Sequence, residues 1–387
     1  MSFAFALDAR SDLARAGRIT TSRGSVETPA FMPVATQASV KSLAPDEVAA
    51  SGARLVIMNT YHLWLRPGAE LIAAHGGLHA FSRWPHLIAT DSGGFQAFSL
   101  AERTRLDEDG FDFASHIDGT RHRLTPEESM RIQGLLGSDV ALQLDVCPAA
   151  GTPRVDLVRA VERTTRWAER CLRARVAGQA LFGIVQGGTD VELRLAHSEK
   201  LAKLPFEGLA LGGFSVGEPK VEMRRALTRV APALDAARPR YLMGVGTPAD
   251  ILHAIGVGID MFDCVLPTRN ARNGQVFVAE GKLVLKNAMF RDDARPLDES
   301  CGCPACAGGF SRAYLRHLYA SGEILAHRLL TLHNLFFYAA LVREARAAIV
   351  RGEYARWSKA ALERLGDAAS DADEADRPLP VDGKNVE

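Results

Sequence analysis

The sequence of 387 residues lacks several features that would assign it to particular classes of protein. Its first 30 residues mix Asp, Arg and Ser with short apolar pieces, so they hold neither the apolar region of a signal peptide nor a membrane span. Six cysteines are too few for a secreted disulfide scaffold of this length. These absences predict a cytoplasmic protein with no membrane partner.

Net charge is also absent, because 46 Lys and Arg residues balance 46 Asp and Glu residues. A zero total neither supports nor excludes nucleic-acid binding, since a local basic surface decides that question. The apolar fraction of 47% and the charged fraction of 24% are typical of a soluble globular protein. The length allows one large domain or two ordinary ones.

Short apolar runs alternate with longer amphipathic stretches, which is the pattern of repeated βα units. Helix starts lie at Thr125, followed by Pro126 and Glu128, and at Thr247, and residues 153–176 and 220–234 have helical spacing. The eight runs expected as strands are residues 30–35, 55–59, 86–91, 139–145, 181–186, 208–213, 241–246 and 258–263.

Eight such runs, with no G-x-G-x-x-G after the first, favour an α/β fold of the (β/α)8 barrel type. A doubly wound sheet stays open as the alternative. Residues 111–123 and 274–286 alternate like hairpins, the first inserted between barrel strands three and four. We expect a catalytic barrel over residues 1–285, a zinc-binding subdomain with C-terminal helices over 286–365, and a disordered tail over 366–387.

Polar residues end nearly every expected strand, and three strands end in carboxylates, Asp91, Asp145 and Asp263. A single Asp at a strand end is as often a helix or turn cap as a functional group. Three of them on the C-terminal rim of one barrel, where such enzymes build their sites, are harder to explain as caps. Carboxylates around one pocket suit chemistry at an anomeric carbon.

A second cluster of reactive side chains is the stretch "CGCPAC" with Cys301, Cys303 and Cys306. Three cysteines within six residues indicate a metal site, and a later histidine would complete a tetrahedral Cys3His set. On spacing alone His317, His327 and His333 compete for that place. Four protein ligands would leave no open position, so the ion would be structural.

Taken in order, "NTYHL", "DSGGFQ", "LDVCP", "VQGG", "GGFSVGE", "YLMGVGTP", "FDCVLPTRNARNG" and the cysteine cluster resemble the bacterial queuine tRNA-ribosyltransferase family, the tRNA-guanine transglycosylases. The resemblance covers about residues 20–345. It implies replacement of guanine at the wobble position of tRNAs with a GUN anticodon by preQ1, the 7-aminomethyl-7-deazaguanine precursor of queuosine. It also implies one structural Zn2+ held by His333 and the three cysteines, and a homodimer.

By matching positions, the resemblance implies that Asp263 is the nucleophile that attacks ribose C1′ and that Asp91 is the general acid and base. Asp145, Gln186 and the backbone of Gly213 would read the guanine-like edge. Asn59 would hydrogen-bond near the nucleophile and orient it. The other pocket residues that the resemblance implies are Ser92, Gly93, Gly94, Phe95, Cys147, Gly212, Phe214, Glu218 and Met243, with Phe95 and Met243 on the two faces of the base.

The resemblance also implies a substrate preference: Cys147 and Val216 match the preQ1-using bacterial members rather than the queuine-using eukaryotic ones, so we expect preQ1. Phe214 departs from the Leu that is usual in the family, at the peptide that would meet the aminomethyl group with support from Glu218. Tyr61 and His62 have no implied role, and we expect them to be supporting or core residues.

The segments that the resemblance assigns to RNA binding are Gly244, Val245, Gly246, Thr247, Pro248, Ala249 and Asp250, and Thr268, Arg269, Asn270, Ala271 and Arg272. Two other functions use similar parts. A non-catalytic RNA-binding subunit would lack the nucleophile, whereas this chain retains Asp263 and Asp91. A nucleoside or glycoside hydrolase would need neither an anticodon-binding segment nor a zinc site.

Overall fold

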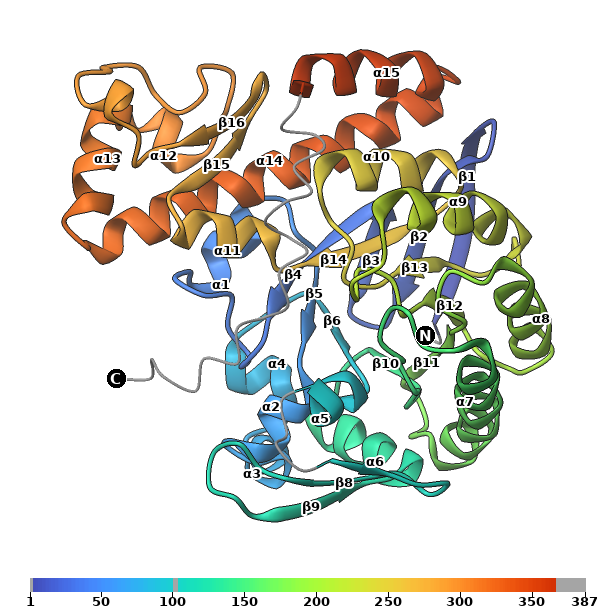
Figure 1. The fold of residues 1–387 in the computed structure, drawn as a ribbon. Coiled ribbons are helices and arrows are strands. Elements are labelled where there is room, and N and C mark those ends of the chain that lie inside the picture. Colours follow the sequence, from blue (N-terminus) through green and yellow to red (C-terminus); the bar gives the residue numbers. More distant parts are fainter. Residues whose placement is uncertain (1–2, 100–103, 367–387) are drawn as a thin grey trace.

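The computed structural model describes residues 3–99 and 104–366. At its centre lies a closed barrel of eight parallel strands whose neighbours follow chain order (Figure 1). This topology confirms the (β/α)8 barrel and excludes the doubly wound sheet. The barrel strands are β4 (Ala30–Ala35), β5 (Leu55–Met58), β6 (Leu87–Thr90), β10 (Val140–Leu142), β11 (Ala180–Val185), β12 (Gly208–Leu211), β13 (Arg240–Leu242) and β14 (Met261–Cys264).

Helices cover the outside of the barrel. Thr125 and Thr247 begin two of them as predicted, since each side chain accepts a hydrogen bond from the backbone N–H three residues on. These helices are α1 (Pro45–Ala50), α2 (Thr60–Leu65), α3 (Ala69–Ala74), α4 (Gly77–Ser82), α5 (Gly94–Ser99), α6 (Pro126–Leu136), α7 (Arg154–Ala174), α8 (Val191–Ala202), α9 (Lys220–Val230) with the 3-10 turn η1 (Ala231–Ala233), α10 (Pro248–Gly256) and α11 (Leu266–Arg272).

A three-stranded antiparallel sheet that the sequence analysis did not predict precedes the barrel. Its Ile19 and Val26 pack in one apolar cluster with the side chains of the barrel interior. Arg15 forms a buried salt bridge of 3.2 Å with Asp260, just before β14, so the sheet covers the N-terminal end of the barrel. This sheet does not cover the opposite end of the barrel, where the carboxyl ends of the strands meet and an active site is expected. The strands are β1 (Ala4–Ser11), β2 (Ala14–Thr21) and β3 (Gly24–Thr28).

Both predicted hairpins are present. Strands β8 (Phe111–Ala114) and β9 (Arg121–Leu124), with β7 (Arg105–Leu106), form a small antiparallel sheet between barrel strands β6 and β10. Strands β15 (Gln275–Val278) and β16 (Gly281–Val284) pair after α11. Val276 and Val278 of this second hairpin share an apolar cluster with Leu315 and Leu330, so the hairpin packs with the C-terminal part of the chain.

The C-terminal part consists of η2 (Ala288–Phe290), α12 (Pro304–Ala307), α13 (Arg312–Ala320), α14 (Ile324–Val350) and α15 (Tyr354–Leu365). The domain boundary expected after residue 285 stays a prediction. Apart from Gly366, the tail expected to be disordered lies outside the described residues.

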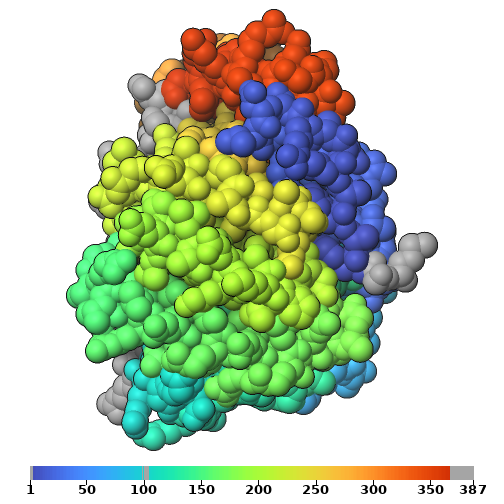
Figure 2. All heavy atoms as spheres, turned by 90° about the vertical axis from the view of Figure 1, so that its right-hand side faces the viewer, coloured from blue at the N-terminus to red at the C-terminus, as the bar shows by residue number. Residues whose placement is uncertain are grey.

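Helix α14 links the two ends of the chain. By length and composition it could cross a membrane, but more than half of the qualifying stretch is buried inside the protein, as in the core helix of a folded domain. Arg346 of α14 forms a salt bridge of 2.6 Å with Asp8 and donates to the carbonyl oxygens of Gly17 and Thr28 at 2.9 and 2.7 Å. Figure 2 shows the blue N-terminal strands beside the red C-terminal helices.

Candidate active site and metal centre

The three predicted carboxylates come together at the C-terminal end of the barrel. Asp91 directly follows β6, Asp145 lies three residues beyond β10, and Asp263 belongs to β14. The charges of Asp263 and Asp145 both act on Asp91, so the three carboxyl groups lie close enough to influence one another. The arrangement therefore gathers like charges in a buried place, where each needs its own hydrogen-bond donors.

Asp91 is held by the residues of the "NTYHL" motif. Its Oδ1 accepts the backbone N–H of Thr60 at 2.9 Å, and its Oδ2 accepts Asn59 Nδ2 at 2.5 Å. Asn59 also caps α2 by accepting the backbone N–H of His62 at 3.0 Å. The structure thus corrects one expectation, because Asn59 orients Asp91 rather than Asp263. The motif is a helix cap whose spare amide hydrogen reaches the carboxylate of the neighbouring strand.

The acidity of Asp91 is shifted strongly. The pKa of Asp91 is raised to about 7, chiefly by burial and to a lesser extent by the nearby charges of Asp263 and Asp145, although the hydrogen bonds from Thr60 and Gly93 act to lower it. A carboxyl group with a pKa near 7 can give up and take back a proton at neutral pH. Asp91 is therefore suited to act as an acid and then as a base.

Asp263 is held by different donors. Its Oδ1 accepts the hydroxyl of Tyr241 at 2.5 Å and the backbone N–H of Gly244 at 2.7 Å. Burial raises the pKa of Asp263, whereas these two bonds favour its charged form and lower it. The sequence analysis missed Tyr241, which lies in the predicted strand next to β14. The contact with Asp263 depends on the Tyr241 side chain pointing from β13 into the barrel, which the sequence alone does not show.

Asp145 forms the third part of the pocket with Gln186. Gln186 Nε2 donates to Asp145 Oδ2 at 2.6 Å, and Ser92 Oγ lies 3.5 Å from Asp145 Oδ1. The pKa of Asp145 is raised to about 6 because burial outweighs the two hydrogen bonds, which act to lower it. Gln186 Oε1 is buried and accepts no hydrogen bond from the part of the chain that the structure describes. An unsatisfied acceptor beside a carboxylate is an arrangement completed by a ligand with N–H donors.

The glycines in this pocket leave room for the amide of Gln186. A Cβ atom on Gly212 would lie 2.7 Å from Gln186 Nε2, and one on Gly213 would lie 2.3 Å from Gln186 Oε1. A Cβ on Gly94 would lie 2.9 Å from the side chain of Leu144. Gly93 and Gly213 also have positive φ angles of 80° and 67°. Side chains at these positions would push the amide or the backbone out of place.

The loop after β12 is held from below by Arg194, a residue that the sequence analysis did not single out. This fully buried guanidinium donates to the carbonyl oxygens of Gly212 at 2.8 Å and Gly213 at 3.2 Å. The ring of Phe214 covers it at 3.7 Å. Phe214 is 3% exposed, so its larger side chain is packed against Arg194.

Glu218 fixes the other end of this loop by accepting the backbone N–H groups of Ser215 at 2.5 Å and Val216 at 2.9 Å. Ser215 has a positive φ of 56°, an unfavourable conformation for a residue with a Cβ. Cys147 is a half-buried thiol whose pKa is raised to about 12 by burial and then by the charge of Asp145. It is therefore a neutral wall of the pocket.

Phe95 and Met243 lie on separate elements at the rim. Phe95 in α5 is 41% exposed, and Met243 directly after β13 is half-buried. The placement of a ring between Phe95 and Met243 stays a prediction.

Tyr61 and His62 point toward the β8–β9 hairpin. Tyr61 is fully buried, its hydroxyl lies 2.9 Å from His116 Nδ1, and its ring stacks on that imidazole. The pKa of His62 is lowered to about 4, chiefly by burial and then by the charge of the neighbouring His116. Both residues therefore support the hairpin next to the pocket, as expected for supporting or core side chains.

The two segments expected to bind RNA differ in accessibility. In the first, Gly244 is exposed, whereas residues 245–250 are buried. The cap of α10 is already occupied by the side chain of Thr247, and Asp250 forms salt bridges with Lys220 and Arg224. The second segment is α11, where Thr268 and Ala271 are buried and residues 269, 270 and 272 are half-buried.

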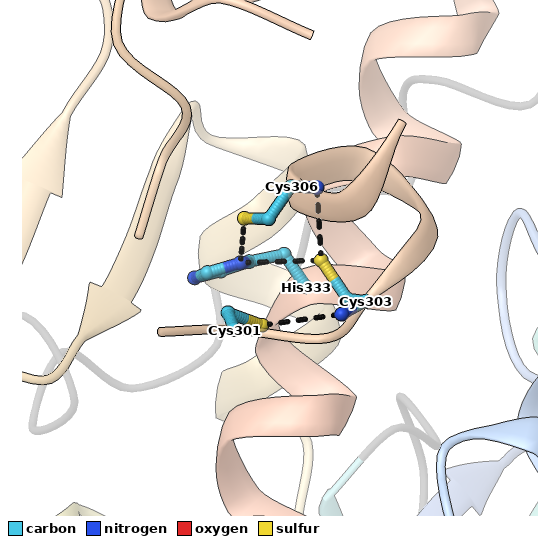
Figure 3. Close-up of side chains that lie close together, drawn as sticks. All are labelled: Cys301, Cys303, Cys306 and His333. Carbon is cyan, nitrogen blue, oxygen red and sulfur yellow. Dashed lines mark hydrogen bonds between the residues drawn. The ribbon is translucent and has the colours of Figure 1, made fainter. Parts of the chain in front are cut away.

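Four side chains meet in the metal centre, as Figure 3 shows. The ligand atoms of Cys301, Cys303, Cys306 and His333 all lie within 4.8 Å of one another. His333 Nδ1 faces the sulfurs of Cys303 and Cys306 at 3.5 and 3.4 Å. His333 Nε2 lies 2.7 Å from the carbonyl oxygen of Phe277, which fixes the ring as a metal-binding histidine requires.

This donor set fits a tetrahedral metal ion with no open position. Within the described residues the cluster includes His333 and neither His317 nor His327. Cys303 begins α12 and Cys306 lies in it, while His333 comes from α14, so the ion would join a short loop to the long helix.

Fold and site together define a class, a (β/α)8-barrel enzyme with a carboxylate pocket at the C-terminal rim and a separate cysteine-histidine metal centre. Comparison with known proteins gives the family. Residues 9–367 match the family model described as "Queuine tRNA-ribosyltransferase". The chain belongs to this family and is a tRNA-guanine transglycosylase. The family assignment makes tRNA its substrate.

Relatives named "Queuine tRNA-ribosyltransferase" are similar over most of their length. The chain is 62% identical to the protein of Sorangium cellulosum over 370 residues, which is 96% of this chain and 93% of that protein. It is 53% identical to the protein of Syntrophobacter fumaroxidans, with 89% and 93% coverage. It is 51% identical to that of Solidesulfovibrio magneticus, with 93% and 97% coverage.

Proposed function

We propose that this enzyme exchanges guanine at the wobble position of GUN-anticodon tRNAs for preQ1 through a covalent tRNA–aspartyl intermediate. The observation that carries the proposal is the pair of half-buried carboxylates with different partners, Asp263 held by Tyr241 and Gly244 and Asp91 held by Asn59 and Thr60. Neighbouring acids whose surroundings give them different pKa values can divide the roles of nucleophile and acid.

In the first step, an oxygen of ionised Asp263 attacks ribose C1′ and the bond from C1′ to guanine breaks. Protonated Asp91 gives its proton to the departing guanine, which leaves as a neutral base. In the second step, the incoming base passes a ring N–H proton to Asp91 and its nitrogen attacks C1′, which frees Asp263. Two displacements at one carbon retain its configuration.

Base selection is proposed for Asp145 and Gln186. The carboxylate of Asp145 would accept the N1–H and exocyclic amine of a guanine-like base, and adenine cannot make this pair. The free Oε1 of Gln186 is a further acceptor for an N–H of the base. These are the acceptors that burial leaves incompletely satisfied.

We propose that the Phe214–Ser215 peptide gives the enzyme its preference for preQ1. Its N–H donates to Glu218, and because a trans peptide directs N–H and C=O to opposite sides, the carbonyl oxygen of Phe214 points away from Glu218. That oxygen is an acceptor for the ammonium group of preQ1. The ring of Phe214 packs on Arg194, so the bulkier side chain leaves the peptide free for this contact.

Phosphate contacts are proposed for cations around α11. The charge of Arg269 lowers the pKa of Arg272 and the charge of Arg272 lowers the pKa of Lys41, in each case after the larger effect of burial. None of the three forms a salt bridge with a carboxylate in residues 3–99 and 104–366. Cations that have no carboxylate partner among the described residues, in and near the helix that follows Asp263, suit the backbone of the anticodon loop.

We also propose that the metal is Zn2+, that two copies of the chain form a homodimer and that the enzyme acts in the cytoplasm. Three thiolates and one imidazole are a donor set preferred by zinc. Exposed apolar side chains of the C-terminal part, including Tyr314, Ile324 and Leu325, are available to an interface. Metal analysis and light scattering measure the first two proposals directly.

The decisive test is capture of the covalent adduct. Wild-type protein, unmodified tRNA and a guanine analogue should give a protein–tRNA complex that survives denaturation. Asp263→Ala should abolish both this complex and the exchange of labelled guanine, because no other group is held in its place. Gln179→Ala, distant from the pocket, is a suitable control. A denaturation-resistant complex in Asp263→Ala would refute the assignment.

The same labelled incubation separates the other readings. Exchange of guanine into tRNA supports the transglycosylase, release of ribose or free guanine without exchange supports a hydrolase, and no reaction supports a binding subunit.

A further inference from the structure

Helix α14 contacts the surroundings of Asp263 through two buried polar side chains on one face. Asn334 and Tyr338 are four residues apart, so they lie on the same side of the helix. Both are fully buried. A buried polar side chain usually has specific partners, and here these partners are backbone groups of α11, of β15 and of the loop after β13 rather than other side chains.

Both the nitrogen and the oxygen of the Asn334 amide form hydrogen bonds with the segment that follows Asp263. Its Nδ2 donates to the carbonyl oxygens of Pro267 at 2.8 Å and Gln275 at 3.1 Å, and its Oδ1 accepts the backbone N–H of Phe277 at 3.0 Å. These bonds join α14 to the start of α11 and to β15. They fix the position of α14 along its axis, because the amide can meet all three groups in only one register.

The hydroxyl of Tyr338 contacts the loop that donates a hydrogen bond to the Asp263 carboxylate. The hydroxyl donates to the carbonyl oxygen of Gly246 at 2.7 Å. Two residues before Gly246, the backbone N–H of Gly244 donates to Asp263 Oδ1 at 2.7 Å. Gly246 itself lies against β14, since a Cβ there would be 2.2 Å from that of Cys264. The loop 244–246 is thus confined between Tyr338 and the strand that carries Asp263.

We propose that Tyr338 is a positioning residue for the nucleophile, acting through Gly246 to keep the Gly244 N–H directed at Asp263, with Asn334 fixing the helix from which it acts. This inference depends on the proposed role of Asp263. Tyr338 lies in the same helix as His333 of the metal centre. Through this helix the C-terminal part would affect the chemistry at Asp263 without contact with the substrate.

The test compares Tyr338→Phe with Tyr354→Phe. Tyr354 offers a matched control because its buried hydroxyl also donates to a backbone carbonyl oxygen, that of Leu252 at 2.5 Å, within α10 rather than in the loop beside Asp263. Each substitution removes one hydroxyl and keeps the ring. Melting temperature and zinc content confirm that both variants are folded and loaded before rates are measured.

We expect Tyr338→Phe to form the covalent tRNA adduct about tenfold more slowly than wild type at saturating tRNA, with the KM for guanine changed less than about twofold. Tyr354→Phe should lose similar thermal stability but keep the wild-type rate. Equal rates in the two variants would overturn the inference alone. Failure of the wild-type protein to form any adduct would overturn the proposed function, and the inference with it.

Discussion

The carboxylate pocket and the cysteine-histidine centre are both buried clusters of ionisable side chains, but they are stabilised in opposite ways. In the pocket, Asp91, Asp145 and Asp263 share one sign of charge, and burial raises the pKa of each. In the metal centre, four ligands converge within 4.8 Å and would be neutralised together by one cation. In the proposed function a substrate would complete the first cluster, whereas a metal ion would complete the second.

The pocket therefore destabilises the fold in the absence of ligand, and the metal centre stabilises it when loaded. Sites with unpaired buried polar groups are expected where function requires them. Substitutions should consequently act with opposite sign in the two clusters: loss of a metal ligand should lower stability, and loss of a pocket charge should raise it.

The largest effect should come from breaking the metal centre with Cys303→Ser. We expect loss of the metal and a fall in the free energy of unfolding of about 5 kcal/mol or more, because binding of the ion contributes directly to folding. Guanine exchange at saturating tRNA should continue in the fraction that remains folded, since four protein ligands leave no position for substrate.

Metal content, melting temperature and exchange are measured on one preparation, with Cys171→Ser as a control for loss of a buried thiol outside the cluster. A Cys303→Ser protein that keeps its metal would show that the ligands are wrong. One that folds and binds tRNA but exchanges no guanine would show that the metal is catalytic.

Asp91→Asn should act in the opposite direction and depend on pH. The folded-state pKa of about 7 lies above the ordinary value of 3.8, so between these values the folded state binds more protons than the unfolded state. The contribution of Asp91 to stability is therefore fully present below about pH 4 and is lost as pH rises through 7. Asp91→Asn removes this loss.

We expect the stability of Asp91→Asn relative to wild type to increase from pH 4 to pH 8 by about 4 kcal/mol at most. Urea unfolding at several pH values measures the difference, while exchange activity is lost for want of an acid. Parallel stability curves for the two proteins would show that Asp91 titrates normally in the folded state.

The sequence predicted the structure correctly where a residue pattern is compatible with only a few kinds of element or site. All eight barrel strands overlap the expected apolar runs, and the three cysteines lie together in one cluster, as their spacing predicted. The N-terminal sheet was missed because most side chains of β1 are exposed or half-buried, so the strand lacks an apolar run. Strand pairing supplied what the local pattern could not.

Within the site, the sequence identified the charged groups better than their partners. Asn59 was placed near the wrong aspartate, because its target depends on which neighbouring strand the α2 cap faces. Arg194 and Tyr241 were missed for the same reason, since an Arg in a helix and a Tyr in a strand have many ordinary roles. Contacts between distant elements arise only once the barrel is closed.

A smaller effect is expected from Asp145→Asn, which keeps the shape of the pocket but replaces an acceptor with an amide. An N–H donor of guanine that is left without its partner costs about 1 to 3 kcal/mol, or roughly tenfold to a hundredfold in affinity. Calorimetry with guanine and with hypoxanthine, which lacks the exocyclic amine, tests this role. The preference of the wild type for guanine should shrink in the variant, and an unchanged preference would assign base selection elsewhere.

The smallest expected effect concerns Tyr241→Phe, which removes one of the two donors to Asp263 Oδ1 and nothing else. The hydroxyl favours the ionised carboxylate, so its loss should raise the pKa of Asp263. In the proposed mechanism, attack on C1′ requires ionised Asp263 and protonated Asp91, which predicts a bell-shaped dependence of the adduct-formation rate on pH. In Tyr241→Phe the acidic limb should move to higher pH by about one unit, equivalent to about 1.4 kcal/mol, while the alkaline limb, set by Asp91, stays nearer its place. Single-turnover rates of adduct formation from pH 4.5 to 9 measure both limbs. If both limbs keep their wild-type positions and only the maximum falls, Tyr241 supports the shape of the barrel and does not tune the nucleophile.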